Sequence, residues 1–178
     1  MEIKRKKITN EKIYETEQKL IGEITELCNA KRPMFEALGY DLELILGQKE
    51  NDAQRAYAPY RADESATFDA GYISHALINV KRPKNQEELA EDARAEQANR
   101  EMLEAAETEE EIQDLEDAET VRIADDNNRR LIAFTELMIA RTYKSFWTDW
   151  VSLGDGIHEI EEDLEEFYEK LLAKSQNA

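Results

Sequence analysis

Carboxylates are the residues of this chain whose number and spacing could do chemistry, since 41 of its 178 residues are Asp or Glu. Acidic residues three positions apart share one face of a helix, where they could hold Mg²⁺ against the phosphates of a substrate. Three such pairs occur: Glu111 with Asp114, Glu116 with Glu119, and Glu159 with Glu162. Chance produces these spacings in so acidic a chain, and the Lys or Arg groups that accompany such sites are missing directly beside the pairs. A metal-dependent all-α phosphohydrolase is therefore the last of three functional hypotheses.

Histidine could supply a transition-metal site at one position. His158 lies three residues after Asp155 and four before Glu162, so both carboxylates could meet it on one helical face. With only two histidines in the chain, a three-ligand site is hard to assemble. His75 lies in a mostly apolar segment and is interpreted as a core or boundary residue. No Ser or Cys nucleophile stands beside a base, and no glycine-rich loop could cradle a phosphate. We therefore expect no enzyme, no cofactor and no metal.

The net charge of −18 is concentrated in two stretches. Residues 86–119 hold fifteen acidic residues against Arg94 and Arg100, a net charge of −13, and residues 155–174 hold eight against Lys170 and Lys174, a net charge of −6. Such stretches repel nucleic acid phosphates and anionic membranes. The expected partner is a protein with a basic surface, or another copy of the chain in a larger assembly. Direct binding to nucleic acid or to a membrane is not expected.

Cysteine content and hydropathy bear on location. Cys28 is the only cysteine, so no intramolecular disulfide can form, which suits a reducing compartment. The chain has no run of 18 apolar residues, and no apolar run follows its basic first residues. A cytoplasmic protein, or part of an intracellularly assembled particle, is expected.

The spacing of helix breakers and apolar residues predicts the elements that must position these groups. Residues 84–153 contain neither Gly nor Pro, which favours long helices. A first helix is predicted to start after Thr9 or Asn10 and to stop at Pro33. Alternation favours a short strand near 40–46 over a short helix, and a loop or short irregular helices are predicted over 47–66. Apolar residues at helical spacing predict another helix over 72–80.

Capping boxes predict two further helices. Asn85 followed by Glu88, and Thr108 followed by Glu111, can each satisfy the first amides of a helix, which places helices at about 86–106 and from about 109. Their apolar stripe is thin, so an antiparallel pair projecting from the body is expected. A central core helix is predicted over 131–147. A last helix is predicted to pack by a narrow seam over 157–171.

The predicted fold is mainly α. It is a helical bundle with long helices, a projecting acidic helix pair, and one short strand or hairpin near 40–46. The whole of 1–178 is predicted to form a single helical domain, with 86–128 as a protruding arm and 1–8 as a basic flexible tail. The tail is interpreted first as a solubilising device, and contact with nucleic acid or with an acidic protein groove is the alternative.

The leading functional hypothesis is a non-enzymatic protein-binding or assembly protein, such as an accessory or structural component of a phage or other virus. The main alternative is an acidic nucleic-acid mimic that inhibits a DNA-binding or nuclease complex. The acidic side chains spread over more than half of the helix circumference, which fits a solvated helix pair better than a mimic. The candidate protein-binding residues are Glu109, Glu110, Glu111, Asp114, Phe146, Trp147, Trp150, Ile157, Ile160, Leu164, Phe167 and Leu171, and the basic tail contributes Lys4, Arg5, Lys6 and Lys7. For Phe146, Trp147 and Trp150, core packing is the favoured interpretation, with Trp150 at the rim, and an exposed interface anchor is the alternative.

Overall fold

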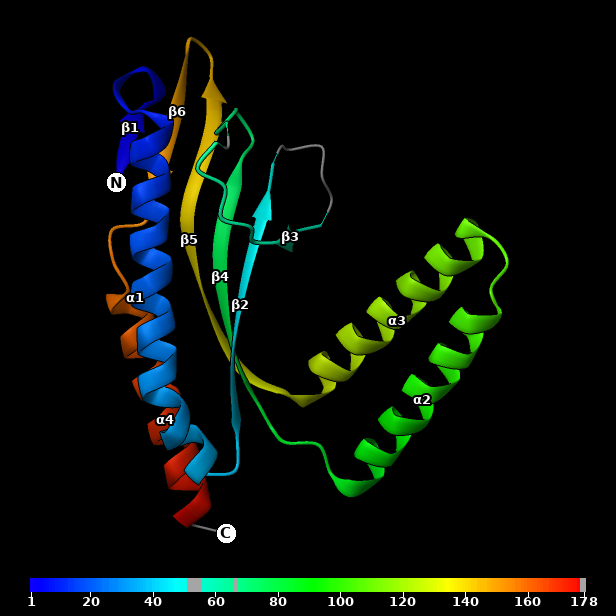
Figure 1. Ribbon diagram of the computed structural model, residues 1–178. Coiled ribbons are helices and arrows are strands. Elements are labelled where there is room, and N and C mark those ends of the chain that lie inside the picture. The colour runs from blue at the N-terminus through cyan, green and yellow to red at the C-terminus, as the bar shows by residue number, and fades with distance from the viewer. Residues whose placement is uncertain (51–55, 66, 177–178) are drawn as a thin grey trace. The chain divides into compact units, whose positions relative to one another are not determined.

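The computed structural model describes residues 1–50, 56–65 and 67–176 (Figure 1). The chain divides into two compact units. The first, called the sheet unit, combines Met1–Val80 with Ala133–Ala178, and the second, called the hairpin unit, is Lys81–Ile132. Of the loop predicted over 47–66, residues 51–55 and 66 lie outside the described residues.

A six-stranded antiparallel sheet forms the centre of the sheet unit. Its strand order is β1-β6-β5-β4-β2-β3. The register pairs Ile3 of β1 with Val151 of β6, and Thr142 of β5 with the same Val151 from the other side. The strands are β1 (Glu2–Lys4), β2 (Asp41–Lys49), β3 (Ala58–Pro59), β4 (Ile73–Lys81), β5 (Leu131–Ser145) and β6 (Thr148–Leu153).

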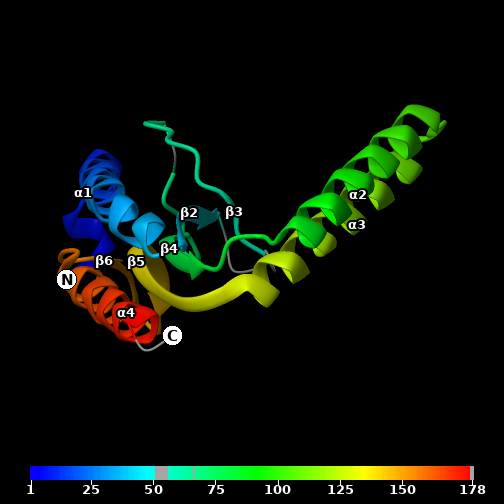
Figure 2. The ribbon, with the colours of Figure 1, turned by 90° about the horizontal axis from the view of Figure 1, so that it is seen from below.

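Two helices, α1 (Asn10–Ala37) and α4 (His158–Gln176), cover one face of this sheet (Figure 2). The core lies between them and the inward-facing strand residues. It is built from large apolar side chains: Ile24, Leu27 and Phe35 of α1, Ile160, Leu164 and Leu171 of α4, and Ile78, Val80 and Ile139 of the sheet. The predicted seam of the last helix is thus the face by which α4 packs within its own chain.

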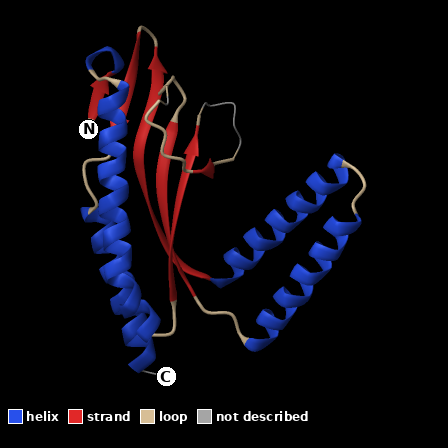
Figure 3. Cartoon of the chain, viewed as in Figure 1, coloured by secondary structure: helices blue, strands red, loops and turns tan. Residues whose placement is uncertain are grey.

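The prediction of a mainly α helical bundle is wrong, because the molecule is a mixed α/β protein (Figure 3). The segment predicted as a helix over 72–80 is β4, in which Ala76, Ile78 and Val80 alternate toward the core. Leu77, between them, is half-buried on the other face, and together these apolar residues imitate helical spacing.

The predicted core helix over 131–147 is strand β5 and the turn that follows it. Leu137 and Ile139 pack in the same cluster as the core of α1 and α4, whereas Ala140 packs with Val151 and Leu153 around Ile13 of α1. The inward-facing positions therefore change from odd to even numbers between Ile139 and Ala140. This change, together with apolar residues on both faces, makes the strand look apolar around most of a helix.

The structure confirms parts of three smaller predictions and corrects the rest. Thr9 caps α1 by accepting a hydrogen bond from the Lys12 amide (3.2 Å), as predicted, but the helix continues through Pro33. It ends before Gly39, whose φ of 81° is a left-handed conformation that glycine adopts without strain. The strand predicted near 40–46 is confirmed as part of β2. The segment predicted as a flexible tail forms β1 and a short 3₁₀ turn, η1 (Arg5–Lys7).

The hairpin unit consists of α2 (Gln86–Ala105) and α3 (Glu109–Arg130). Both predicted capping boxes are confirmed: the Asn85 side chain accepts from the Glu88 amide, and the Thr108 side chain accepts from the Glu111 amide. Each Glu side chain in turn accepts from its cap residue's own amide. The two helices therefore begin where the sequence predicts.

Charged side chains, and not apolar ones, lie between the start of α2 and the end of α3, and we call this end of the helix pair its root. Within the described residues, no apolar side chain of the hairpin unit is fully buried. Arg122 of α3 bridges Asp92 of α2 (2.8 Å) and Glu119 (2.7 Å), while Lys84 contacts Asp126 (2.9 Å). Arg130 also binds Asp126 (3.1 Å). Ion pairs therefore join the start of α2 to the end of α3.

The first turn of α2 has a further ion pair. Both terminal nitrogens of Arg82 donate to the Glu88 carboxylate, at 2.6 and 2.8 Å. These hydrogen bonds lower the pKa of Glu88 to about 2. Glu88 thus stays ionised as a capping residue down to strongly acidic pH.

Replacing Arg122 with Gln should loosen α2 and α3 selectively, because it removes the one side chain that joins Asp92 to Glu119. Partly exposed ion pairs contribute up to about 1 kcal/mol each. We therefore expect amide exchange in both helices to become about fivefold to tenfold faster, with the core of α1 unchanged. Hydrogen-exchange mass spectrometry measures this, and about 1 M NaCl should reproduce part of the effect in the wild type by screening.

The matched control is Arg94→Gln, since Arg94 lies exposed on α2 and, among the described residues, its side chain donates to the Ala90 carbonyl alone. Unchanged exchange in α2 and α3 of the Arg122 variant would show that contacts other than these ion pairs hold the helices together.

Candidate docking surface

The turn between β5 and β6 exposes two large aromatic side chains. Ser145 pairs with Thr148, so Phe146 and Trp147 are the two residues of a tight hairpin loop. Phe146 is 96% exposed and Trp147 is 97% exposed. Neither residue has a positive φ, so the turn does not demand Asn or Gly, but water disfavours exposed aromatic rings. Packing within the chain does not account for these two residues.

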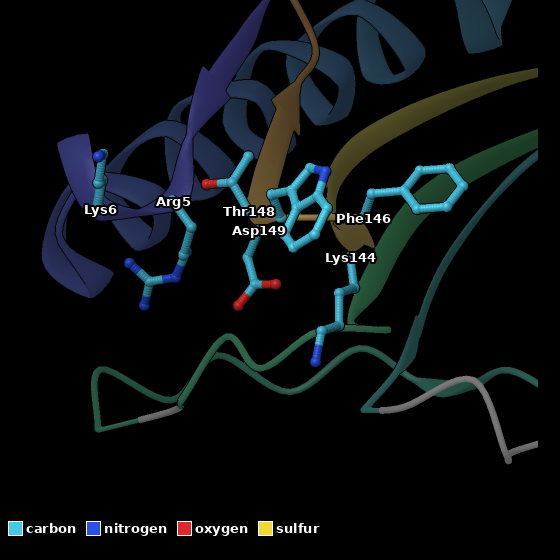
Figure 4. Close-up of a pocket in the computed structure, with 7 residues that line it drawn as sticks. Arg5, Lys6, Lys144, Phe146, Thr148 and Asp149 are labelled. Atoms are coloured by element: carbon cyan, nitrogen blue, oxygen red, sulfur yellow. The ribbon is translucent and has the colours of Figure 1, made fainter.

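Three cations and one carboxylate line a hollow beside this aromatic pair. Arg5, Lys6 and Lys144 line an open hollow of ≈ 640 Å³ together with Phe146, Trp147, Thr148 and Asp149. Figure 4 shows Phe146 and Lys144 at the turn, with Arg5 and Lys6 contributed by the chain's first residues. We call Arg5, Lys6, Lys144, Phe146 and Trp147 the tip surface. It is a basic and aromatic surface in a chain with a net charge of −18.

Pairing of β1 with β6 brings the basic N-terminal segment to this position. Lys4 lies opposite Trp150 in the register, and its ammonium lies 5.7 Å from the centre of the Trp150 ring. Arg5 is fixed by donating to the Ile8 carbonyl (2.7 Å) and to the Asn10 side chain. The N-terminal cations are therefore held on an ordered element beside the aromatic turn, an arrangement that sequence analysis did not foresee.

The other predicted binding residues fall into separate places. Trp150 is half-buried on β6. The predicted seam residues Ile160, Leu164 and Leu171 are buried in the core, with Ile157 and Phe167 packed against it. The acidic residues Glu109, Glu110, Glu111 and Asp114 lie exposed at the start of α3, where Glu111 also serves the capping box. The structure therefore leaves the seam no free apolar face.

The residues considered for catalysis and metal binding form no metal-ligand cluster among the described residues. No group of three or more His, Cys, Asp or Glu side chains in the described part of the chain could hold a metal ion. His158 pairs with Glu162 (3.1 Å) on the exposed side of α4. His75 lies on β4 and not on a helix. Its ring stacks on Tyr57 with centres 3.8 Å apart, and burial lowers its pKa.

Sequence analysis missed a buried carboxylate, that of Glu17. It lies beneath a second hollow of the sheet unit, which Tyr60 and Tyr72 also line. Glu17 occupies the core-facing stripe of α1, four residues after Ile13, and is only 1% exposed. The Tyr72 hydroxyl donates to its Oε1 (2.8 Å), Ser74 donates to the same oxygen, and the Tyr60 hydroxyl donates to Oε2 (3.3 Å). A polar residue in an otherwise apolar stripe was the available signal.

Burial raises the pKa of Glu17, while the hydrogen bonds from Ser74, Tyr72 and Tyr60 partly oppose this rise. No ion pair joins Glu17 to a cation among the described residues, so burial of its charge is compensated by hydroxyl groups alone. The hollow above it measures ≈ 580 Å³ and is lined by mixed polar and aromatic groups that include Tyr14, Phe68 and Asp69. Because three donors already satisfy the carboxylate, we interpret Glu17 as a link between α1 and the sheet.

Comparisons with known proteins add no relative to this geometry. No protein-family model matches the chain, and no curated protein or solved structure matches it either. The expectation of a phage or viral component thus has no support from any relative. Among the helices of the described residues, none is long and apolar enough to cross a membrane.

Changing Phe146 to Asn and Trp147 to Gly together should lower the free energy of unfolding by no more than about 1 kcal/mol. The removed rings have almost no contacts to lose, and only the added backbone freedom of the glycine in the unfolded chain opposes folding. Urea denaturation followed by circular dichroism measures the difference. A loss above about 1 kcal/mol would mean that the aromatic pair stabilises the fold and was not retained for docking.

Replacing Glu17 with Gln should change how stability depends on pH. Burial raises the folded-state pKa of Glu17 above its ordinary value, so the folded wild type holds this proton at pH values where the unfolded chain has lost it. Its free energy of unfolding therefore falls as pH rises from the unfolded pKa through the folded pKa. The stability of the variant lacks this fall. Above the folded pKa, the free energy of unfolding of the variant should therefore rise relative to that of the wild type by about 1.4 kcal/mol for each unit by which the pKa is raised.

Urea denaturation of both chains between about pH 4 and about pH 8 provides the measurement. The control is Glu26→Gln, an exposed position of the same helix, which should show no such trend. A Glu17→Gln difference that stays constant across the pH range would contradict the raised pKa.

Proposed function

We propose that this chain is a non-enzymatic docking protein of an assembly, which anchors a partner protein by the tip surface. The observation that carries the proposal is the almost complete exposure of Phe146 and Trp147 at a turn that has no structural need for them. Phe, Trp and Arg are enriched at protein interfaces, and Trp and Arg are among the residues that dominate binding energy there.

The size of the aromatic pair supports an anchor. Side chains of this kind bury roughly 150–250 Å² each. At about 25 cal/mol per Å², two of them supply on the order of 10 kcal/mol before the entropic costs of association. Lys144, Arg5 and Lys6 add a preference for an acidic rim around the pocket that receives the rings. The favoured partner surface is therefore an apolar pocket bordered by carboxylates.

The acidic helix pair supports a second docking surface of opposite charge. The carboxylates at its root, such as Asp92, Glu119 and Asp126, are paired with the pair's own cations. Those near the α2–α3 turn, such as Glu109 and Asp114, are exposed. Neutralisation at the root weakens the nucleic-acid mimic hypothesis, because a mimic needs its charges free along the whole length. A cytoplasmic location, which the lone buried Cys28 suits, is part of the same proposal.

Photo-crosslinking in the native cell tests the proposal. A photoreactive phenylalanine analogue placed at Trp147 should give a discrete crosslinked product, because this position would lie inside the partner's pocket. The matched control places the same analogue at Glu169, an exposed position of α4, and should give none. Absence of a product from position 147, or the same products from both positions, would contradict docking by the tip surface.

A further inference from the structure

An apolar groove lies at the end of the hairpin unit, beside the α2–α3 turn. Its floor is made by Met102, Ala105 and Ala106 of the α2 end and by Leu115 of α3. Glu111 and Asp114 complete the lining, and the groove measures ≈ 420 Å³. Met102 is about half exposed, so the floor is open to solvent. Methionine contacts aromatic rings favourably and adapts to their shape.

The groove and the tip surface have complementary chemistry. The tip surface presents two aromatic rings beside Arg5, Lys6 and Lys144, whose three positive charges outweigh the one carboxylate of the hollow, Asp149. The groove presents a small apolar floor bordered by carboxylates, in the chain's most acidic stretch, residues 86–119. Each therefore supplies what the other needs: rings meet an apolar floor, and cations meet carboxylates.

We propose that the groove at the α2–α3 turn receives Phe146 and Trp147 of a second copy of this chain. This inference rests on the proposed docking function and names the partner. The pairing joins two different surfaces, so the assembly as a whole keeps one free tip surface and one free groove after each contact. Such head-to-tail contacts extend into open chains or close into rings. The chain is thus a self-assembling protein with one repeated heterologous contact.

The expected strength is modest. Two aromatic side chains bury roughly 300–500 Å² in total on the tip side, less than the roughly 800 Å² per partner of a stable interface. The assembly should therefore form at micromolar concentrations and weaken as salt screens the charged rim.

Complementary variants test the contact. The tip variant is Phe146→Asn with Trp147→Gly. The groove variant is Met102→Lys with Asp114→Lys, two exposed positions whose replacement places like charges opposite Lys144 and Arg5. The control variant is Leu89→Lys with Glu91→Lys, which makes the same kinds of change at exposed positions of α2 away from the groove.

Sedimentation velocity of the full chain from about 1 to about 100 µM measures the assembly. The wild type and the control variant should gain mass with concentration, whereas the tip and groove variants should each stay monomeric, with association weakened at least about tenfold. An equimolar mixture of the two defective variants should form a dimer and grow no further. In that mixture the groove variant supplies an intact tip and the tip variant supplies an intact groove.

Three outcomes would overturn the inference: a wild type that stays monomeric throughout the range, a mixture that stays monomeric, or loss of assembly in the control variant. The first includes the case in which a chain's tip surface and groove engage each other without a second copy. If the wild type stays monomeric while position 147 still crosslinks to a different protein in the cell, only the second copy as partner is refuted. If neither result appears, the docking function fails as well.

Discussion

The apolar contact between α1 and the inner face of the sheet is the interaction on which the rest of the structure depends. Ile24 of α1 is fully buried against the layer that contains Ile78 and Ile139, and α4 completes the cover. Each such side chain contributes about 1.5–3 kcal/mol on burial. Only a sheet fixed in this way can hold β5 and β6 in the register that ends at Ser145 and Thr148, and thereby present an aromatic turn.

The hairpin unit follows a different physical principle. Its root is built from ion pairs around Arg122 and Asp126, while its exposed surface keeps isolated apolar residues such as Leu89 and Val121. Ion pairs at partly exposed positions contribute little free energy each, so this helix pair is less strongly stabilised than the sheet unit. A weakly stabilised element with exposed apolar groups gains from a partner that covers them, and this agrees with a groove at its end.

Local signals predicted some elements well. The capping boxes at Asn85 and Thr108 placed α2 and α3, because a cap depends on neighbours three residues apart and on nothing else. The strands β4 and β5 were missed, since their apolar residues on both faces and the shift of parity after Ile139 imitate a helical stripe. Absence of Gly and Pro was given too much weight. The β-branched and aromatic residues of 131–147 favour a strand, and that signal was available.

For the tip surface, the sequence predicted candidate residues but neither their exposure nor their basic neighbours. The prediction that Phe146 and Trp147 pack in the core is wrong, because both lie almost fully exposed in a turn and not at the end of a core helix. Their exposure becomes visible only when Ser145 pairs with Thr148, and the N-terminal cations reach them only because β1 is the partner of β6. The same pairing explains how basic residues come to be concentrated in so acidic a chain. The strand register places Arg5 and Lys6 beside the aromatic turn, although they precede it by about 140 positions in the sequence. The carboxylates of the hairpin unit form another surface, of opposite charge.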